Sequence, residues 1–101
     1  MSEPQAKTPV LARRESRDDI ARIASAHGAH NVRVFGSAGR GEASAADLDL
    51  LVEMSAGRSL LDLIALSNEL EETLGVEVDV LSENGLSPYL RDRILAEAVP
   101  L

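Results

Sequence analysis

The chain has 101 residues, which suits one domain with a modest core, since single domains usually hold about 100–150 residues. Its 17 acidic and 10 basic residues leave a net charge of −7, which argues against binding nucleic acid by neutralising phosphates. There is no Cys, and two His residues are too few for a histidine-based metal cage. Because no apolar run approaches the ~20 residues of a membrane span, we expect a soluble, cytoplasmic protein with no membrane contact.

The first 15 residues are predicted to form a flexible tail, because they contain two prolines and no sustained hydrophobic period. A single domain is expected over residues 16–101. Ser16 and Asp19 resemble a capping box, so we predict a first helix that begins at Ser16 and ends near Gly28.

The middle of the chain alternates strand and helix patterns. Residues 32–35 predict a short strand, and the Gly/Ala/Ser-rich stretch 36–46 has room for a short helix from Ser37. Residues 47–53 alternate acidic and aliphatic side chains, which predicts a second strand.

A second long helix is predicted after Ser59, where Ser59 and Asp62 repeat the capping pattern; four leucines form its apolar stripe and Gly75 ends it. Residues 76–81 predict a third strand. Ser87-Pro88 then begins a last helix, whose apolar face and Tyr89 are expected to be partly buried. Strands that alternate with helices predict an α/β fold with a small sheet flanked by helices.

Three aspartates are the strongest candidates for chemistry. Asp47 and Asp49 point to the same side of their strand, with Cα atoms ~6.6 Å apart, and can therefore converge on Mg²⁺. Asp79 would reach the same site if its strand is a neighbour. The alternative interpretation is that alternating acids form the solvated face of a half-buried sheet.

Gly36-Ser37 follows a strand and precedes the predicted short helix. Backbone N–H groups at a helix N-terminus, together with a serine hydroxyl, suit a phosphate group, and glycine permits its close approach. An ordinary serine N-cap is the alternative. Arg40 would neutralise a phosphate, or it pairs with Glu42 in a purely structural role.

A Gly-Ser turn, an Arg-Gly pair, two aspartates separated by one residue, and a later aspartate on a strand occur in that order. They are Gly36-Ser37, Arg40-Gly41, Asp47, Asp49 and Asp79. This order resembles the signature of minimal nucleotidyltransferases, the MNT-type antitoxins encoded beside HEPN-domain toxins. The resemblance covers nearly the whole chain from Ser16, and it implies a small mixed sheet in a polymerase-β-like nucleotidyltransferase core.

The resemblance also implies an activity. Such an antitoxin is a protein adenylyltransferase, which transfers AMP from ATP to a tyrosine of its cognate HEPN RNase toxin. The three aspartates would hold two Mg²⁺ ions and be catalytic, and the nucleotide would bind at Gly36, Ser37 and Arg40. The implied partner is the HEPN toxin itself, in a hetero-oligomer, with no direct contact to nucleic acid.

Two departures from the family pattern keep a second function open. Ala46 stands where serine is usual, and the loop before Asp47 is one residue shorter. If these changes make the nucleotide site degenerate, the chain would instead be a non-catalytic antitoxin that neutralises its toxin by direct binding.

Overall fold

A computed structural model describes residues 13–36 and 47–101 of the chain. The tail predicted over residues 1–15 is described only from residue 13, and the short helix predicted from Ser37 lies outside the described residues. In chain order the elements are α1 (Arg14–Ala26), β1 (Ala29–Phe35), β2 (Asp47–Met54), α3 (Leu60–Leu74), β3 (Glu77–Ser82), the short 3-10 helix η3 (Glu83–Gly85), α4 (Pro88–Glu97) and β4 (Val99–Pro100).

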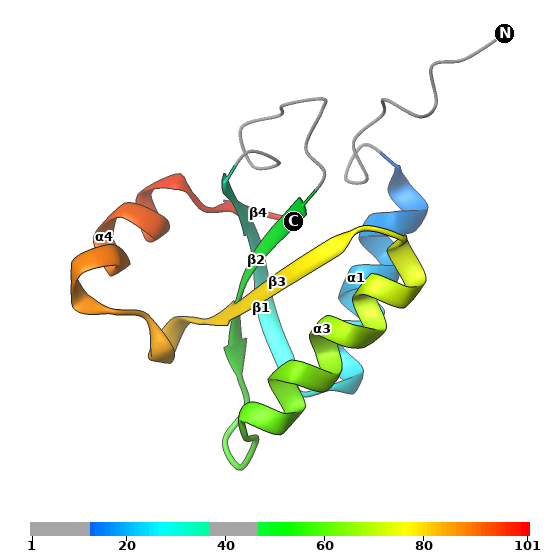
Figure 1. The fold of residues 1–101 in the computed structure, drawn as a ribbon, viewed down its shortest axis with the longest axis horizontal. Helices are drawn as coiled ribbons and strands as arrows, with labels where there is room; N and C mark the ends of the chain where they lie inside the picture. Colours follow the sequence, from blue (N-terminus) through cyan, green and yellow to red (C-terminus); the bar gives the residue numbers. More distant parts are fainter. Residues whose placement is uncertain (1–12, 37–46) are drawn as a thin grey trace, which may run out of the picture.

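The four strands form one mixed sheet in the order β3-β2-β1-β4 (Figure 1). β1 runs antiparallel to both β2 and β4, whereas β2 and β3 are parallel. The parallel pair is connected through α3, as a crossover between parallel strands requires. The predicted α/β fold with a small mixed sheet is therefore confirmed.

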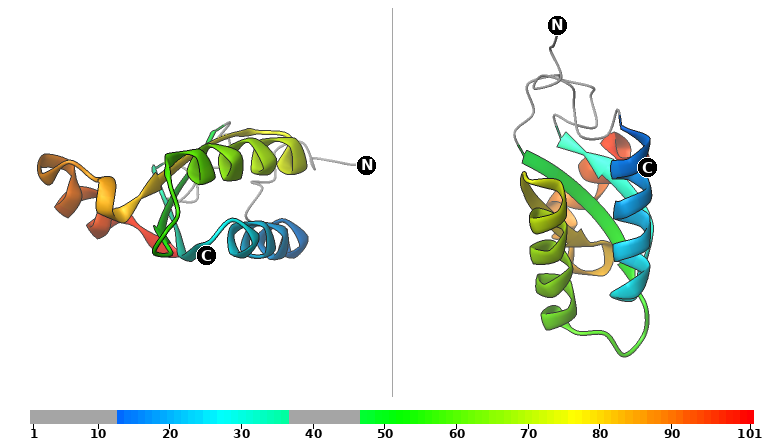
Figure 2. Two further views of the ribbon diagram at one scale, coloured as in Figure 1. Left: turned by 90° about the horizontal axis from the view of Figure 1, so that it is seen from below. Right: turned by 90° about the vertical axis from the view of Figure 1, so that its right-hand side faces the viewer.

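α1 and α3 form a single layer over one face of the sheet (Figure 2). Alternate aliphatic residues of β2 and β3 point into this layer and are buried, because side chains of a strand alternate between its two faces. The central buried side chains are Ile20, Ile23, Leu48, Leu50, Val52, Leu66, Leu70, Val78 and Val80. The intervening residues of the same strands face the other side of the sheet.

The two ends of α3 follow their sequence signals. The Leu61 N–H donates to the Ser59 hydroxyl at 3.2 Å, and the Ser59 N–H donates to the Asp62 carboxylate at 2.8 Å. Gly75 ends the helix with a φ of +74°, in the left-handed region that glycine adopts without steric cost. The predicted capping box and terminating glycine are both confirmed.

The predicted start of α1 is wrong. The helix begins at Arg14, and Arg13 occupies the N-cap position without a side-chain capping bond. Ser16 is instead buried within the helix, on the face that also buries Ile20 and Ile23. A side chain that points into the core cannot fold back to cap the helix, which explains the failed prediction.

α4 begins as predicted, with the Ser87 hydroxyl accepting from the Tyr89 N–H at 3.2 Å and Pro88 in the first turn. However, the helix buries none of its residues, and Tyr89 is 94% exposed, so its predicted partial burial is wrong. Figure 1 shows the reason: α4 lies apart from the α1–α3 layer, between η3 and β4. No helix of the described residues is long and apolar enough to cross a membrane.

Replacement of Leu70 by alanine should lower the free energy of unfolding by about 2–5 kcal/mol, because Leu70 is fully buried between α3 and the sheet. Leu61→Ala on the same helix is the matched control, since Leu61 is 76% exposed and its loss should change stability by less than about 0.5 kcal/mol. Urea denaturation of both variants measures the difference. Equal destabilisation would contradict the packing described here.

Candidate active site

Two of the predicted site aspartates lie side by side on neighbouring strands. In the parallel pairing of β2 with β3, Asp49 and Asp79 are direct partners, and Asp47 is the partner of Glu77. Adjacent strands are about 4.8 Å apart, and paired residues point to the same face. The structure thus brings Asp79 next to Asp49, which the sequence allowed only on the condition that their strands are neighbours.

For Asp47, the structure describes the backbone but not the side chain. Asp47 is the first residue of β2, two residues before Asp49, but its side chain lies outside the description. Among the described residues, no group of three or more His, Asp or Glu is close enough to hold a metal ion. The three-acid metal site therefore stays a prediction.

Asp49 and Asp79 occupy the sheet face that α1 and α3 leave uncovered. Leu48 and Leu50 flank Asp49 in β2 and are buried in the helix layer, so Asp49 points the other way. Asp49 is half-buried, and Asp79 on the edge strand β3 is exposed. A pair of carboxylates on an accessible face can bind a cation such as Mg²⁺, which prefers oxygen ligands.

Gly36 lies at the end of β1, directly against Asp49. Its φ is +75°, and a Cβ atom at this position would be 2.5 Å from Asp49 Oδ2. The preceding residue, Phe35, is the strand partner of Asp49, which explains this proximity. Both the backbone conformation and the carboxylate require a glycine here. The other two predicted nucleotide ligands, Ser37 and Arg40, lie outside the described residues.

An ionic cluster on the same sheet face was not anticipated from the sequence. Arg33 on β1 donates to Glu83 Oε1 at 2.6 Å, and Arg91 on α4 donates to Glu83 Oε2 at 3.3 Å and to its carbonyl at 3.2 Å. The hydrogen bond from Arg33 lowers the pKa of the Glu83 carboxyl, with a smaller contribution from Arg91. Glu83 therefore links β1, η3 and α4. No local spacing signals a contact between residues 50 positions apart.

The family model for the nucleotidyltransferase domain matches residues 15–101. A relative from Methanocaldococcus jannaschii, named "Putative protein adenylyltransferase MJ0435", is 50% identical over 86 residues, which cover 84% of this chain and 92% of that protein.

Solved structures give the same result for the fold. A structure described as a "putative minimal nucleotidyltransferase" superimposes with a TM-score of 0.80 at 48% identity, over 93% of this chain and 97% of that one. An MNT antitoxin solved in complex with the tri-AMPylated HEPN toxin of Shewanella oneidensis matches with a TM-score of 0.68, over 85% of this chain and 68% of that one. At 16% identity, the second likeness concerns the fold alone.

Gly36→Ala should destabilise the protein more than Gly75→Ala. Both glycines have a φ near +75°, but a Cβ at Gly75 meets nothing within 4 Å, whereas one at Gly36 meets Asp49. We expect about 1 kcal/mol for the shared backbone strain and a further loss at Gly36 only. Thermal unfolding of the two variants provides the comparison, and equal losses would show that Gly36 does not contact Asp49.

Glu83→Gln should alter how stability depends on pH. The folded-state pKa of Glu83 is lowered, so its stabilising contribution is present above the unfolded pKa and is lost as pH falls through the folded value. The stability gap between wild type and variant should therefore narrow between about pH 5 and pH 3.

Glu72→Gln is the control for this experiment. Glu72 is exposed on α3, and the described part of the chain offers it no hydrogen bond or ion pair. Chemical denaturation at several pH values measures both variants. A gap for Glu83→Gln that stays constant across this range would contradict the role of Arg33 as the cause of the shift.

Proposed function

This chain belongs to the nucleotidyltransferase domain family, and from that premise we propose that it is a cytoplasmic antitoxin that transfers AMP from ATP to a tyrosine of a cognate HEPN RNase toxin. The adjacent carboxylates of Asp49 and Asp79 beside Gly36 are the observation on which the proposal depends. The relative named as a protein adenylyltransferase and the fold shared with an MNT antitoxin support it.

In this proposal the triphosphate of ATP binds where β1 ends. The glycine at position 36 allows the backbone to lie directly against the Asp49 carboxylate, so that a phosphate bound here would lie close to the proposed metal ligands. Backbone N–H groups after a strand are suitable donors to phosphate oxygens, and the Ser37 hydroxyl adds another. The guanidinium of Arg40 would pair with a phosphate, because arginine matches its geometry. Such cationic and N–H donors are needed in a chain whose net charge is −7.

In this proposal the three aspartates are the ligands of a pair of divalent cations. Asp47 and Asp49 lie two residues apart on β2, Asp79 is the strand partner of Asp49, and carboxylate oxygens are the ligands that Mg²⁺ prefers. When bound, two Mg²⁺ ions would neutralise charge on the triphosphate and on the aspartates that hold them. Asp49 is half-buried on β2, which lies between β1 and β3, and we assign it as the central ligand of the two metal ions.

The transfer itself is a displacement at phosphorus. The phenolic oxygen of the acceptor tyrosine bonds to the α-phosphorus of ATP, while the bond from that phosphorus to the oxygen bridging the β-phosphate breaks. Pyrophosphate leaves with the bond electrons. We assign the phenolic proton to the Asp79 carboxylate, because Asp79 is the more exposed of the paired acids.

The acceptor in this proposal is a separate protein. Support comes from the structurally similar MNT antitoxin, which was solved in complex with a separate, AMPylated HEPN toxin. With a net charge of −7, the chain should attract a toxin through a basic surface, and their association should slow as salt is added. A hetero-oligomer of antitoxin and toxin follows from this arrangement.

A catalytic antitoxin should protect at substoichiometric amounts. With ATP and Mg²⁺, a small fraction of the wild-type chain should inactivate the RNase activity of the HEPN protein, whose intact mass should rise in steps of one AMP. Asp49→Asn should reduce the rate by at least about a hundredfold, because it removes a carboxylate from the transition-state environment.

Glu72→Gln makes the same change of a carboxylate to an amide at an exposed position on α3 that lines neither cavity near β3; it is the control and should transfer AMP at the wild-type rate. Protection that needs one antitoxin per toxin, ignores ATP and survives Asp49→Asn would overturn the enzymatic proposal. That outcome would establish the non-catalytic antitoxin instead.

A further inference from the structure

The outer edge of β3 is only partly covered. Near the start of the strand, the Val78 N–H donates to Glu71 Oε2 at 3.0 Å, and the Ser67 hydroxyl donates to the Val78 carbonyl at 2.6 Å. Both partners are side chains of α3. The backbone groups of Val78 therefore point away from β2, and α3 satisfies them.

The second half of the strand lacks such hydrogen bonds among the described residues, although Val80 itself is only 8% exposed. Because backbone groups alternate along a strand, the N–H and C=O of Val80 and the N–H of Ser82 also point away from β2. In the described part of the chain, β3 is the edge of the sheet and no side chain bonds to these groups. An edge of this kind is a template on which another extended segment can pair.

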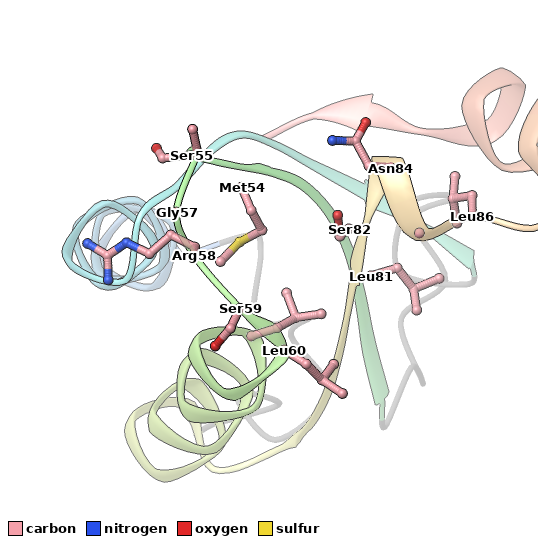
Figure 3. A pocket seen from close by; sticks show the side chains of 13 residues that line it. Met54, Ser55, Gly57, Arg58, Ser59, Leu60, Leu81, Ser82, Asn84 and Leu86 are labelled. Atoms are coloured by element: carbon pink, nitrogen blue, oxygen red, sulfur yellow. The ribbon is translucent and has the colours of Figure 1, made fainter.

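Two cavities lie along this uncovered half, and we call them together the β3 groove. One, of about 540 Å³, lies between the start of α3 and the ends of β2 and β3; the other, of about 220 Å³, lies beside Asp79 and Val80. Leu60 and Leu63 line both. Figure 3 shows Leu60 and Leu81 on opposite sides of the larger cavity. Leu60 is 69% exposed, so its apolar side chain is available for contact with a partner.

The charges around the β3 groove indicate which side chains it can take. Arg58 is the cation of the larger cavity, and it is already paired with Asp62 at 3.3 Å. The rest of that lining consists of Leu, Met, Ala, Ser, Asn and Gly. Such a surface accepts apolar side chains, while the free backbone groups of β3 require a partner with an extended backbone.

We propose that the β3 groove docks an extended, apolar segment of the acceptor protein, which adds to the sheet beside β3. This inference rests on the proposed function and names the surface that recognises its protein substrate. The groove reaches from Ser82 to Asp79, one of the proposed catalytic acids, so a segment bound along it would lead toward the reacting end of the sheet. Main-chain pairing would give affinity, and the two cavities would select alternate side chains.

A second copy of this chain is the less suitable occupant. Two copies paired through β3 would bring together two molecules that each carry a net charge of −7. Repulsion between them opposes such a dimer, whereas the same charge attracts an acceptor with a basic surface. The test below includes self-association as an outcome.

Leu60→Asp should weaken binding of the purified HEPN acceptor protein by at least about tenfold, because it places a charge in the apolar groove. Binding is measured by calorimetry without nucleotide, so that no catalytic step contributes. Leu61→Asp is the matched control: Leu61 is 76% exposed on the same helical turn but lines neither cavity, and its affinity should equal that of wild type. An aspartate in the first turn of α3 suits the helix dipole, so both variants should fold.

Ser82→Pro tests the backbone contribution separately. It removes one outward N–H at a residue whose φ of −87° is near the range of proline, and it leaves the leucines of the groove in place. We expect a fewfold loss of affinity for the acceptor, with thermal stability close to that of wild type.

The outcomes separate the β3 groove from the catalytic proposal. Asp49→Asn should bind the acceptor with wild-type affinity and yet fail to transfer AMP. That result would support both the docking role of the β3 groove and the catalytic role of Asp49. Wild-type affinity in Leu60→Asp, or equal losses in Leu60→Asp and Leu61→Asp, would overturn the groove proposal whether or not AMP is transferred. Light scattering that shows a wild-type dimer converted to a monomer by Leu60→Asp would also overturn it, since the occupant would then be a second copy.

Discussion

The parallel, in-register pairing of β2 with β3 is the constraint on which the rest of the structure depends. It places Leu48 beside Val78 and Leu50 beside Val80, and all four side chains belong to the core. The same register places Asp49 beside Asp79 on the opposite face. A shift of one residue in either strand would bury a carboxylate and expose an aliphatic side chain, so the free energy of the core also holds the acid pair together.

The helices follow from this division of the sheet into two faces. α1 and α3 bury the aliphatic face, and α3 also serves as the connection that parallel strands require. Both helices lie on one side of the sheet, and on the other side Asp49 is half-buried and Asp79 is exposed. On that face, Glu83 links β1 to α4 through its bonds with Arg33 and Arg91. α4 buries none of its residues, so its position depends on its connections to η3 and β4 and on this ionic contact.

Short sequence motifs predicted the ends of a helix correctly where contacts between nearby residues determine them. The capping box of α3 and its terminal Gly75 formed as predicted, because each involves atoms only a few residues apart. The same type of signal failed at Ser16, where burial against the sheet took precedence over capping. Tyr89 was misjudged for a related reason: a helical pattern cannot tell whether another element lies against the helix.

The sequence by itself determined which residues share a face of each strand, because alternation is a property of the single strand, and it therefore predicted that Asp47 and Asp49 point the same way. It also indicated the need for a glycine before Ser37. Only the tertiary structure decided that Asp79 is the partner of Asp49, that Gly36 contacts its carboxylate, and that β3 is an edge strand with an open groove. These features depend on the order and direction of strands in the sheet, which are set by packing between segments far apart in the chain.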